Sequence, residues 1–496
     1  MAILSETIPV GEWLPDRADL ENQGCLVALN CIPDGEDYKP FPSFAGQTDT
    51  LAAQCYGGYD HVSSGGTITK FIATREKIYT VSGGTYTDVT NTGADYLTPS
   101  DGCWFFTQFG DRVIATNYVD KIQTYLVGTD TEFEDLIQSG PDVKCRNFGI
   151  INNFLVCGDI VDDDGVTPNR IRWSPINDPA GDWTPSQSTQ SDYQNCEDGN
   201  PGAAMSIISG QNYGIIHFRR ATYIMEYVGP PNIFSFKLIE QGRGPVNAQA
   251  VTWNGSDSFY RSDDGLYQFN GNMSIPIGER KTDKYFKDHV DETYLYNIRM
   301  TTDPNNKTVL LAYTSTAATN GRNDKILLYH WATQRFTEVD QACDFIYRGL
   351  TSGYTLEELG AEYPDIESVP YSLDSAFWAG GNSLLSGVVD DVLGYFQGEP
   401  MTAYLETQES RLNSDGMSYL QSVLPVYEGG TCKVRVGHRK IVNGSINYTP
   451  YVDVSDDTGE ANFEIEARYH RAGVELTGDW SYFQGIRFRA EAGSGI

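Results

Sequence analysis

Short runs of β-branched and aromatic residues, broken by Gly, Asp and Asn, recur along most of the chain. Such runs predict short strands joined by tight turns. The strands come in pairs, namely Lys77–Val81 with Thr85–Thr90, Arg112–Thr116 with Ile122–Val127, Phe154–Cys157 with Ile171–Ser174, Tyr213–His217 with Ala221–Val228, Ser258–Arg261 with Leu266–Asn270, Val309–Tyr313 with Ile326–Trp331, and Ser375–Ala379 with Leu393–Gln397.

The pairs begin roughly 35 to 65 residues apart, which is typical of β-propeller blades whose loops carry insertions. A single four-stranded blade cannot bury both of its faces, whereas radial stacking of several blades buries them all. The pattern therefore predicts an all-β fold with a β-propeller of six or seven irregular blades over residues 46–400. Two stacked β-sandwiches are the alternative that the pattern leaves open.

The pattern changes after Pro400, where longer alternating stretches predict a β-sandwich-like or open-sheet platform over residues 401–496. The expected strands are 401–410, 421–427, 431–439, 447–454, 462–469 and 482–490. Residues 1–45 are extended and rich in Pro, so they cannot fold alone. We expect them to form an arm that docks on the platform; the alternative is an arm that wraps only the propeller.

Helical periodicity is scarce. Residues 283–290 predict one or two helical turns with Thr282 as the N-cap, and Thr355–Glu358 resembles a capping box that opens another short helix. Helices are therefore expected to contribute little to the fold.

The 496 residues include 67 acidic and 35 basic ones, which gives a formal net charge of −32. Residues 61–400 alone carry 44 acidic and 24 basic side chains. A static nucleic-acid binder needs a basic footprint, and the composition supplies none. The charge indicates either simple solubility or a surface that must not adhere to a polyanion.

The nine cysteines form no CxxC pair, and the six histidines lack metal-like spacing. No metal and no cofactor are predicted. His217 and His330 lie inside apolar runs and are interpreted as core histidines. The opening residues MAILSETIPVGEW do not predict a signal peptide, and no apolar run is long enough to predict a membrane segment.

Enzyme signatures are missing from the sequence: it contains no GxxxxGK[ST], HExxH or GxSxG pattern. Gly242-Arg-Gly244 precedes a predicted strand and is followed by Pro245, which removes a backbone donor. A glycosidase-type carboxylate pair cannot be selected among 67 acids. We therefore predict a protein that is not an enzyme and has no catalytic residues.

Two acidic turns stand out. Ser262-Asp-Asp-Gly265 resembles the Asp-box turn of propellers, in which a carboxylate ties down a hairpin. Asp162, Asp163 and Asp164, followed by Gly165, offer carboxylates around a turn, as calcium sites do, but lack the longer DxDxDG spacing. A solvated loop between strands is therefore the favoured interpretation of the second turn.

Several segments together resemble the tail nozzle, or packaged-DNA stabilisation, proteins of short-tailed bacteriophages. They are Ile8–Asp16 (IPVGEWLPD), Ala28-x-Asn30-x-Ile32-Pro33, Tyr38–Pro42, Arg170–Ser174 with Asp178-Pro179 and Asp182-Trp183, Gly242–Pro245 leading to Asp264–Gly271 and Ile275–Gly278, and Arg468–Arg489 with Trp480 and Gly485. None of these blocks is a catalytic signature.

The resemblance implies a structural protein of the virion tail, assembled in the host cytoplasm. Its members form a ring, expected to be a homohexamer, below the head-to-tail adaptor or portal complex. The ring extends the DNA channel and helps retain packaged DNA until ejection. The implied partners are the adaptor, tail fibres or tailspikes, a tail plug or needle, and, transiently, double-stranded DNA.

Two other functions remain open at this stage. One is a receptor- or glycan-binding propeller, with or without glycan cleavage, at a phage or cell surface. The other is a propeller scaffold in a bacterial cytosol. Within the nozzle hypothesis, Asp162, Asp163 and Asp164 are the candidate channel-facing residues, where carboxylates would repel DNA phosphates. The alternative is that these three residues face outward into solvent.

Overall fold

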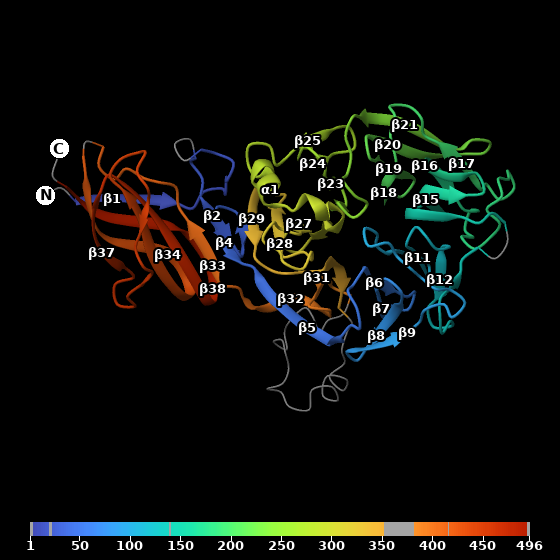
Figure 1. Cartoon of the computed structure of the whole chain (residues 1–496), viewed down its shortest axis with the longest axis horizontal. Coiled ribbons are helices and arrows are strands. Elements are labelled where there is room, and N and C mark those ends of the chain that lie inside the picture. The colour runs from blue at the N-terminus through green and yellow to red at the C-terminus, as the bar shows by residue number, and fades with distance from the viewer. Residues whose placement is uncertain (1–2, 19–21, 138–139, 352–380, 415, 494–496) are drawn as a thin grey trace.

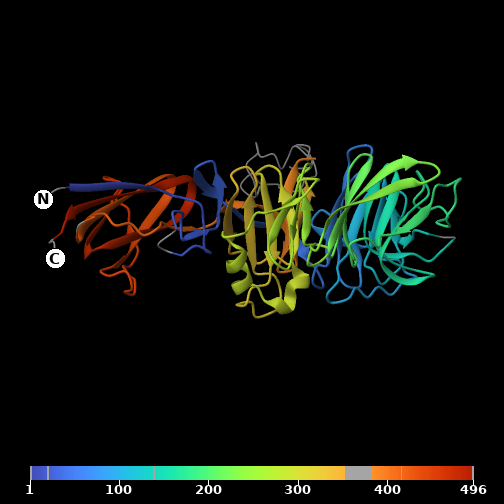
Figure 2. The same cartoon turned by 90° about the horizontal axis from the view of Figure 1, so that it is seen from above.

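The computed structural model describes residues 3–18, 22–137, 140–351, 381–414 and 416–493. Two parts are visible in Figure 1: blades arranged around a common centre, and a curled sheet at one side of them. Seen from above, the curled sheet extends away from the blades, and both ends of the chain lie at its far end (Figure 2). The predicted Thr355–Glu358 helix and Ser375–Ala379 strand lie outside the described residues.

Six separate four-stranded antiparallel sheets form six of the blades. The first three are β6 (Gly57–Val62), β7 (Ile68–Ala73), β8 (Ile78–Ser82) and β9 (Thr85–Asp88); β10 (Phe105–Phe109), β11 (Arg112–Thr116), β12 (Gln123–Leu126) and β13 (Glu134–Asp135); and β14 (Lys144–Ile151), β15 (Phe154–Asp162), β16 (Gly165–Trp173) and β17 (Asp192–Asn195). The others are β18 (Ala204–Ser209), β19 (Tyr213–Phe218), β20 (Ala221–Gly229) and β21 (Ile233–Gln241); β22 (Val251–Trp253), β23 (Ser258–Arg261), β24 (Leu266–Phe269) and β25 (Ser274–Pro276); and β30 (Phe345–Leu350), β31 (Ser383–Val389), β32 (Val392–Pro400) and β5 (Pro42–Thr50).

A seventh unit has the same order of strands but is not a separate sheet. It consists of β26 (Arg299–Asp303), β27 (Thr308–Tyr313), β28 (Lys325–His330) and β29 (Arg335–Val339). Contacts between innermost strands run from β6 to β10, β14 and β18, and from β22 through β26 and β30 back to β6. Ile208 and Ile215 pack against Tyr260 and Phe269 and so join the remaining two blades. The predicted β-propeller is confirmed.

Closure of the ring depends on a strand from the N-terminal region. β5 pairs antiparallel with β32, with Phe44 opposite Phe396, and so completes the last blade. A buried ion pair of the first blade lies at the junction with this one: the Lys70 ammonium on β7 is 2.7 Å from the Asp60 carboxylate on β6, and Lys70 also donates to the Leu350 carbonyl of β30. Asp60 also accepts hydrogen bonds from the Leu350 backbone amide (2.6 Å) and the Tyr347 hydroxyl (3.2 Å).

The C-terminal part is a curled open sheet, which decides between the two forms of platform expected from the sequence. Its strands are β33 (Ala403–Glu406), β34 (Ser418–Arg439), β35 (Asn447–Tyr448), β36 (Val452–Asp453), β37 (Ala461–Ala467) and β38 (Tyr469–Ala492). The predicted strands 421–427 and 431–439 are one strand, β34, because pairing with β38 continues past Gly429 through register shifts instead of a turn.

The N-terminal arm is part of this sheet. It contributes β1 (Ile3–Pro9), β2 (Val27–Leu29), β3 (Cys31–Asp34) and β4 (Asp37–Pro40). β1 pairs with β38, and β2 pairs antiparallel with β33 and parallel with β29. The prediction that the arm docks on the platform is confirmed, and wrapping of the propeller alone is wrong. Because β29 belongs to the seventh blade unit, β2 makes one continuous sheet of that unit and the platform.

One hydrophobic core fills the junction. Its buried side chains come from the arm (Trp13, Tyr38), the propeller (Phe259, Tyr313) and the curled sheet (Trp480, among others). Burial of apolar surface contributes roughly 25 cal/mol per Å². The two parts therefore stabilise each other through a shared interior.

Helix α1 (Asp283–His289) lies where the sequence predicts a helix, and the 3₁₀ helix η1 (Glu292–Asn297) follows it. Thr282 occupies the N-cap position but makes no side-chain cap hydrogen bond. Instead, Asp16 of the arm accepts hydrogen bonds from the backbone amides of Lys284 (2.9 Å) and Tyr285 (2.6 Å). Free amides of a first helical turn favour such a carboxylate. Neither helix is long and apolar enough to cross a membrane, nor is any other in the described ranges.

Candidate functional site

The acidic run Asp162–Asp164 lies at the tip of the β15–β16 hairpin. Asp162 pairs with Gly165, so Asp163 and Asp164 form the turn, and Gly165 directly after them takes a positive φ (+90°) that glycine adopts without strain. The sequence interpretation, a loop from Cys157 to Ile171, is wrong. Both strands continue to the tip, with a register shift beside Asp159.

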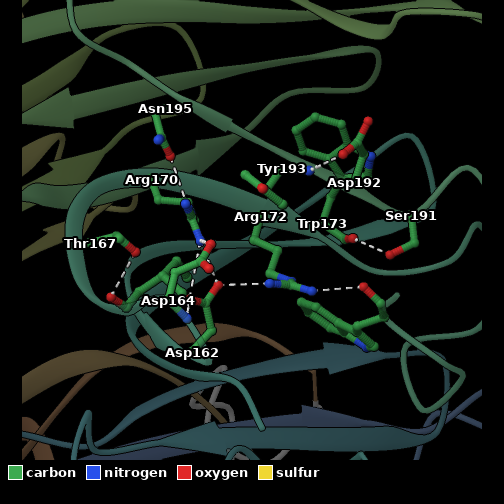
Figure 3. A network of polar contacts seen from close by, with 12 residues as sticks. Asp162, Asp164, Thr167, Arg170, Arg172, Trp173, Ser191, Asp192, Tyr193 and Asn195 are labelled. Atoms are coloured by element: carbon green, nitrogen blue, oxygen red, sulfur yellow. Dashed lines mark hydrogen bonds and ion pairs between the residues drawn. The ribbon is translucent and has the colours of Figure 1, made fainter. Parts of the chain in front are cut away.

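Two of the three carboxylates bind arginines from β16 (Figure 3). Arg170 donates to Asp162 at 3.0 Å and to Asp164 at 2.7 Å, and Arg172 donates to Asp162 at 2.7 Å. The side chains of Asp162 and of both arginines are at least 95% buried. Burial disfavours a charged guanidinium, but hydrogen bonds to the two carboxylates hold the pKa of Arg170 above its usual value.

The arginines extend this network to the outer strand and the following loop. Tyr193 on β17 lies under both guanidiniums, with 4.0 Å from the Arg170 carbon to the ring centre. Arg172 donates to the carbonyl oxygen of Trp183 at 2.9 Å, and Arg170 donates to Asn195 at 2.9 Å. The network therefore holds three strands and a loop together, and its acids are not free to attract or repel a ligand.

Asp163 is exposed at the turn and makes no hydrogen bond or ion pair with the described residues. Lys144, the first residue of β14, pairs with Val161. Asp163 follows Val161 by two residues, so it extends past the start of β14. Its orientation toward a DNA path stays a prediction. No group of three His, Cys, Asp or Glu side chains suited to a metal ion occurs in the described part of the chain.

The Ser262–Gly265 turn is structural, as predicted. The Ser262 amide donates to the Gly265 carbonyl, and Asp264 accepts a hydrogen bond from the Tyr267 hydroxyl at 2.8 Å. Asp263 forms an ion pair with Arg219 of the preceding blade at 2.7 Å. These contacts tie the hairpin down and join two blades.

The predicted core histidines are confirmed. His217 is fully buried between Thr222 (3.0 Å) and Ser258 (2.8 Å), and burial lowers its pKa to about 3. His330 is buried against Thr333 at 2.8 Å, and burial lowers its pKa as well.

A pocket that the sequence did not reveal lies where the innermost strands begin. Its volume is about 440 Å³. It is lined by Phe105 of β10, Arg146 of β14, Met205 of β18, Gln249 just before β22, and Arg299 of β26. Innermost strands of a propeller run in one direction, so their first residues gather at one face. The pocket is therefore axial. Asp162, Asp163 and Asp164 are not among its lining residues.

The segments that carry the phage-nozzle resemblance occupy structural junctions. Trp13 and Asp16 pack against or cap α1, and Arg170 and Arg172 organise the hairpin. A Cβ on Gly244 would lie 1.8 Å from the Phe218 carbonyl oxygen, so only glycine fits there.

Comparison with known proteins finds only distant structural similarities. No family model and no curated protein matches the sequence. Among solved structures, the extracellular domain of a hybrid two-component system from B. thetaiotaomicron is similar at 11% identity and a TM-score of 0.42. The similarity covers 82% of this chain and 47% of that one, so the chain spans about half of that protein.

Two further solved structures are similar over shorter parts of the chain. The CNH domain of AfRom2 matches at 8% identity and a TM-score of 0.36, covering 71% of this chain and 96% of that one. The Pan2 WD40 domain of Neurospora crassa matches at 9% identity and a TM-score of 0.37, covering 64% and 91%. The class that the strand pairing defines is an all-β propeller protein with a fused curled sheet.

Proposed function

We propose that the chain is a non-enzymatic structural protein of a short-tailed bacteriophage tail, a nozzle or hub that forms a ring below the head-to-tail adaptor. The ring extends the DNA channel and helps retain packaged DNA. The observation that carries this proposal is where the resembling segments lie: Ile8–Asp16 at the arm's junction with α1, and Arg170–Ser174 in the hairpin network. The resemblance therefore concerns residues that determine the fold.

The charge and the architecture support the same role. A net charge of −32 disfavours adhesion to DNA, so phosphate repulsion would keep the duplex sliding. The continuous sheet through β2 joins the platform directly to the propeller. We propose that the platform meets the adaptor and that tail fibres or tailspikes and a plug bind elsewhere on the ring.

The proposal is tested by mixing the purified chain with the adaptor complex and imaging the products, together with a search for the chain in purified virions. We expect six-fold rings on the adaptor and the chain in the particle. A chain that stays monomeric with the adaptor and is missing from virions would overturn the nozzle. A glycan array with an activity screen tests the main alternative, because specific glycan binding or turnover would favour the surface propeller.

The hairpin tip offers a narrower test of a DNA-facing position. Substituting all three acids would break the buried Arg170 and Arg172 ion pairs, so the informative variant is Asp163→Lys alone. If Asp163 faces the DNA path, release should slow at low salt and recover at moderate salt, which screens the new attraction. Asp457→Lys makes the same charge change on an exposed platform residue and serves as the control. Wild-type release by Asp163→Lys particles would place the hairpin away from the DNA.

A further inference from the structure

The axial pocket contains a buried positive charge that the rest of the protein does not neutralise. Arg299 is the first residue of β26, and only 6% of its surface is exposed. Its Nη1 donates to the backbone carbonyl oxygens of Tyr296 at 2.6 Å and Ile298 at 3.1 Å. Its Nε is buried and has no hydrogen-bond partner among the described residues.

Four arginines are buried in the described chain, and three of them lie beside a carboxylate. Arg170 and Arg172 bind Asp162, and Arg261 lies 3.8 Å from Asp283. Arg299 forms no ion pair with any described residue, and burial lowers its pKa. A buried charge is normally paired, because its desolvation cost is otherwise uncompensated. Arg299 therefore differs from the other three in having no carboxylate partner among the described residues.

The second arginine of the pocket is already neutralised. Arg146 lies 2.6 Å from the Asp159 carboxylate and stacks on the Tyr118 ring, with 4.1 Å to the ring centre. One exposed acid, Asp101, lies in the lining. The interior of the pocket thus holds one uncompensated positive charge, in a chain whose net charge is −32.

Three neutral polar side chains of the lining are occupied by protein partners. The Asn247 amide donates to the carbonyls of Leu295 and Ile298, the Asn117 amide donates to Asp120, and the Gln249 amide donates to the Cys103 sulfur at 3.4 Å. Phe105, Met205 and Val246 add apolar surface. Donor capacity therefore remains at Arg299, beside an apolar wall.

We propose that the axial pocket binds a small monocarboxylate, with its carboxylate on Arg299 and an aromatic or aliphatic stem against Phe105, Met205 and Val246. A guanidinium matches the planar carboxylate. One uncompensated charge matches a monoanion, whereas the second negative charge of a phosphate dianion would have no partner and would be repelled by Asp101. The pocket volume of about 440 Å³ exceeds that of a small organic acid and suits a ligand with a stem of one ring.

Benzoate is the probe, with benzamide as its neutral isostere and inorganic phosphate as the alternative anion. Binding to the full-length chain is followed by calorimetry and by ligand-observed NMR. We expect benzoate to bind with a Kd in the millimolar range or tighter, and benzamide and phosphate to bind at least tenfold more weakly. Equal binding of benzamide, stronger binding of phosphate, or no binding of benzoate would each overturn the proposal.

Variants locate the site. Arg299→Met should weaken benzoate binding at least tenfold, whereas Arg219→Met, which removes a half-buried, paired arginine outside the pocket lining, should leave it unchanged. Because Arg299→Met is a core substitution, Val246→Phe provides a second variant that fills the pocket and leaves the arginine in place; it should block binding too. Asp101→Asn should strengthen binding about two- to threefold by removing a nearby like charge. Wild-type affinity in either pocket variant would contradict the assignment.

Discussion

The propeller and the curled sheet are both antiparallel, but they are assembled from the chain in different ways. Each blade from β6 to β29 takes four strands that follow one another in sequence. The curled sheet instead pairs Ile3 with Glu491, the two ends of the described chain. Pairing over such a separation requires closure of a very long loop. Blades can therefore form locally, whereas the curled sheet requires both ends of the chain.

The two parts nevertheless share one interior. Trp13 of the arm and Phe259 of the propeller belong to the same buried cluster as Trp480 of the curled sheet. By contrast, the blades on the other side of the ring have cores of their own, such as the cluster around Trp183. This difference predicts that a substitution in the core of the arm lowers the stability of both parts of the molecule.

The largest effect is expected for Trp13→Ala. Trp13 is 4% exposed, packs edge-on against Tyr285 with 5.0 Å between ring centres, and donates to the Leu26 carbonyl. Its loss should lower the free energy of unfolding by about 3–5 kcal/mol. Calorimetry should show a single transition moved to lower temperature, as for the control Trp183→Ala in the propeller. A separate early transition that leaves the main one unmoved would show that the two parts unfold independently.

A somewhat smaller effect is expected at the closure of the ring. Asp60→Ala leaves the Lys70 ammonium, whose side chain is 12% exposed, without its partner. The free energy of unfolding should fall by about 3 kcal/mol, the lower end for breaking a buried pair. Amide exchange should rise in β6 and β30 first, because Asp60 joins those strands.

Asp88→Ala is the matched control for ring closure. It breaks the Lys77–Asp88 pair, which has the short separation of 2.6 Å but is exposed. Its effect should stay below about 1 kcal/mol. Equal effects of the Asp60 and Asp88 substitutions would rule out a special role for the buried pair in closing the ring.

The smallest effect concerns pH and compares one histidine from each part. Burial lowers the pKa of His217 in the propeller to about 3 and that of His470 in the curled sheet to about 4. In the unfolded chain the histidine pKa is near 6.5. At pH values between the folded and the unfolded pKa, the unfolded chain therefore binds more protons than the folded chain. The stability that each neutral histidine provides is therefore complete above about pH 6.5 and is lost as the pH falls. At pH 5 each loss is about 2 kcal/mol.

Buried carboxyl groups shift stability in the opposite direction, because burial raises the pKa of Asp283 and Asp344 to about 6. The measurement is therefore a difference: the free energy of unfolding at pH 7 and pH 5 for the wild type, His217→Gln and His470→Gln. Each variant should lose less stability between the two pH values than the wild type by about 2 kcal/mol. Parallel pH profiles would contradict the assignment of these histidines as buried and neutral.

The sequence predicted the propeller because its central strands are apolar and local. The outer strands, such as β13 (Glu134–Asp135), are short and polar and could not be seen in the pattern. The fusion of two predicted strands into β34 was missed because Gly429-Gly430 marks a turn as readily as a register shift. The docking of the arm was predictable in outline, since a Pro-rich segment has no core of its own, but its partners lie hundreds of residues away.

The candidate sites also divide into those that the sequence pattern could reveal and those that it could not. A hairpin turn near Asp163-Asp164 could have been predicted from the Asp-Gly signal at Asp164-Gly165, which centres the turn one residue further along; it would have placed Arg170 and Arg172 near Asp162. The axial pocket could not, because its lining comes from five blades and Arg299 has no motif around it. A local turn can be predicted from the sequence, whereas the convergence of residues from five blades at the propeller axis cannot.

The strand β2 has a mechanical consequence. Its residues Val27–Leu29 join the platform to the propeller. Backbone hydrogen bonds flank it on both sides: the Leu26 amide donates to the Glu406 carbonyl oxygen and the Asn30 amide to the Glu338 carbonyl oxygen, each at 2.8 Å. Bending of the sheet at β2 would break these hydrogen bonds and expose the shared core. We therefore expect the molecule to act as a lever, in which a torque applied to the curled sheet is transmitted to the propeller.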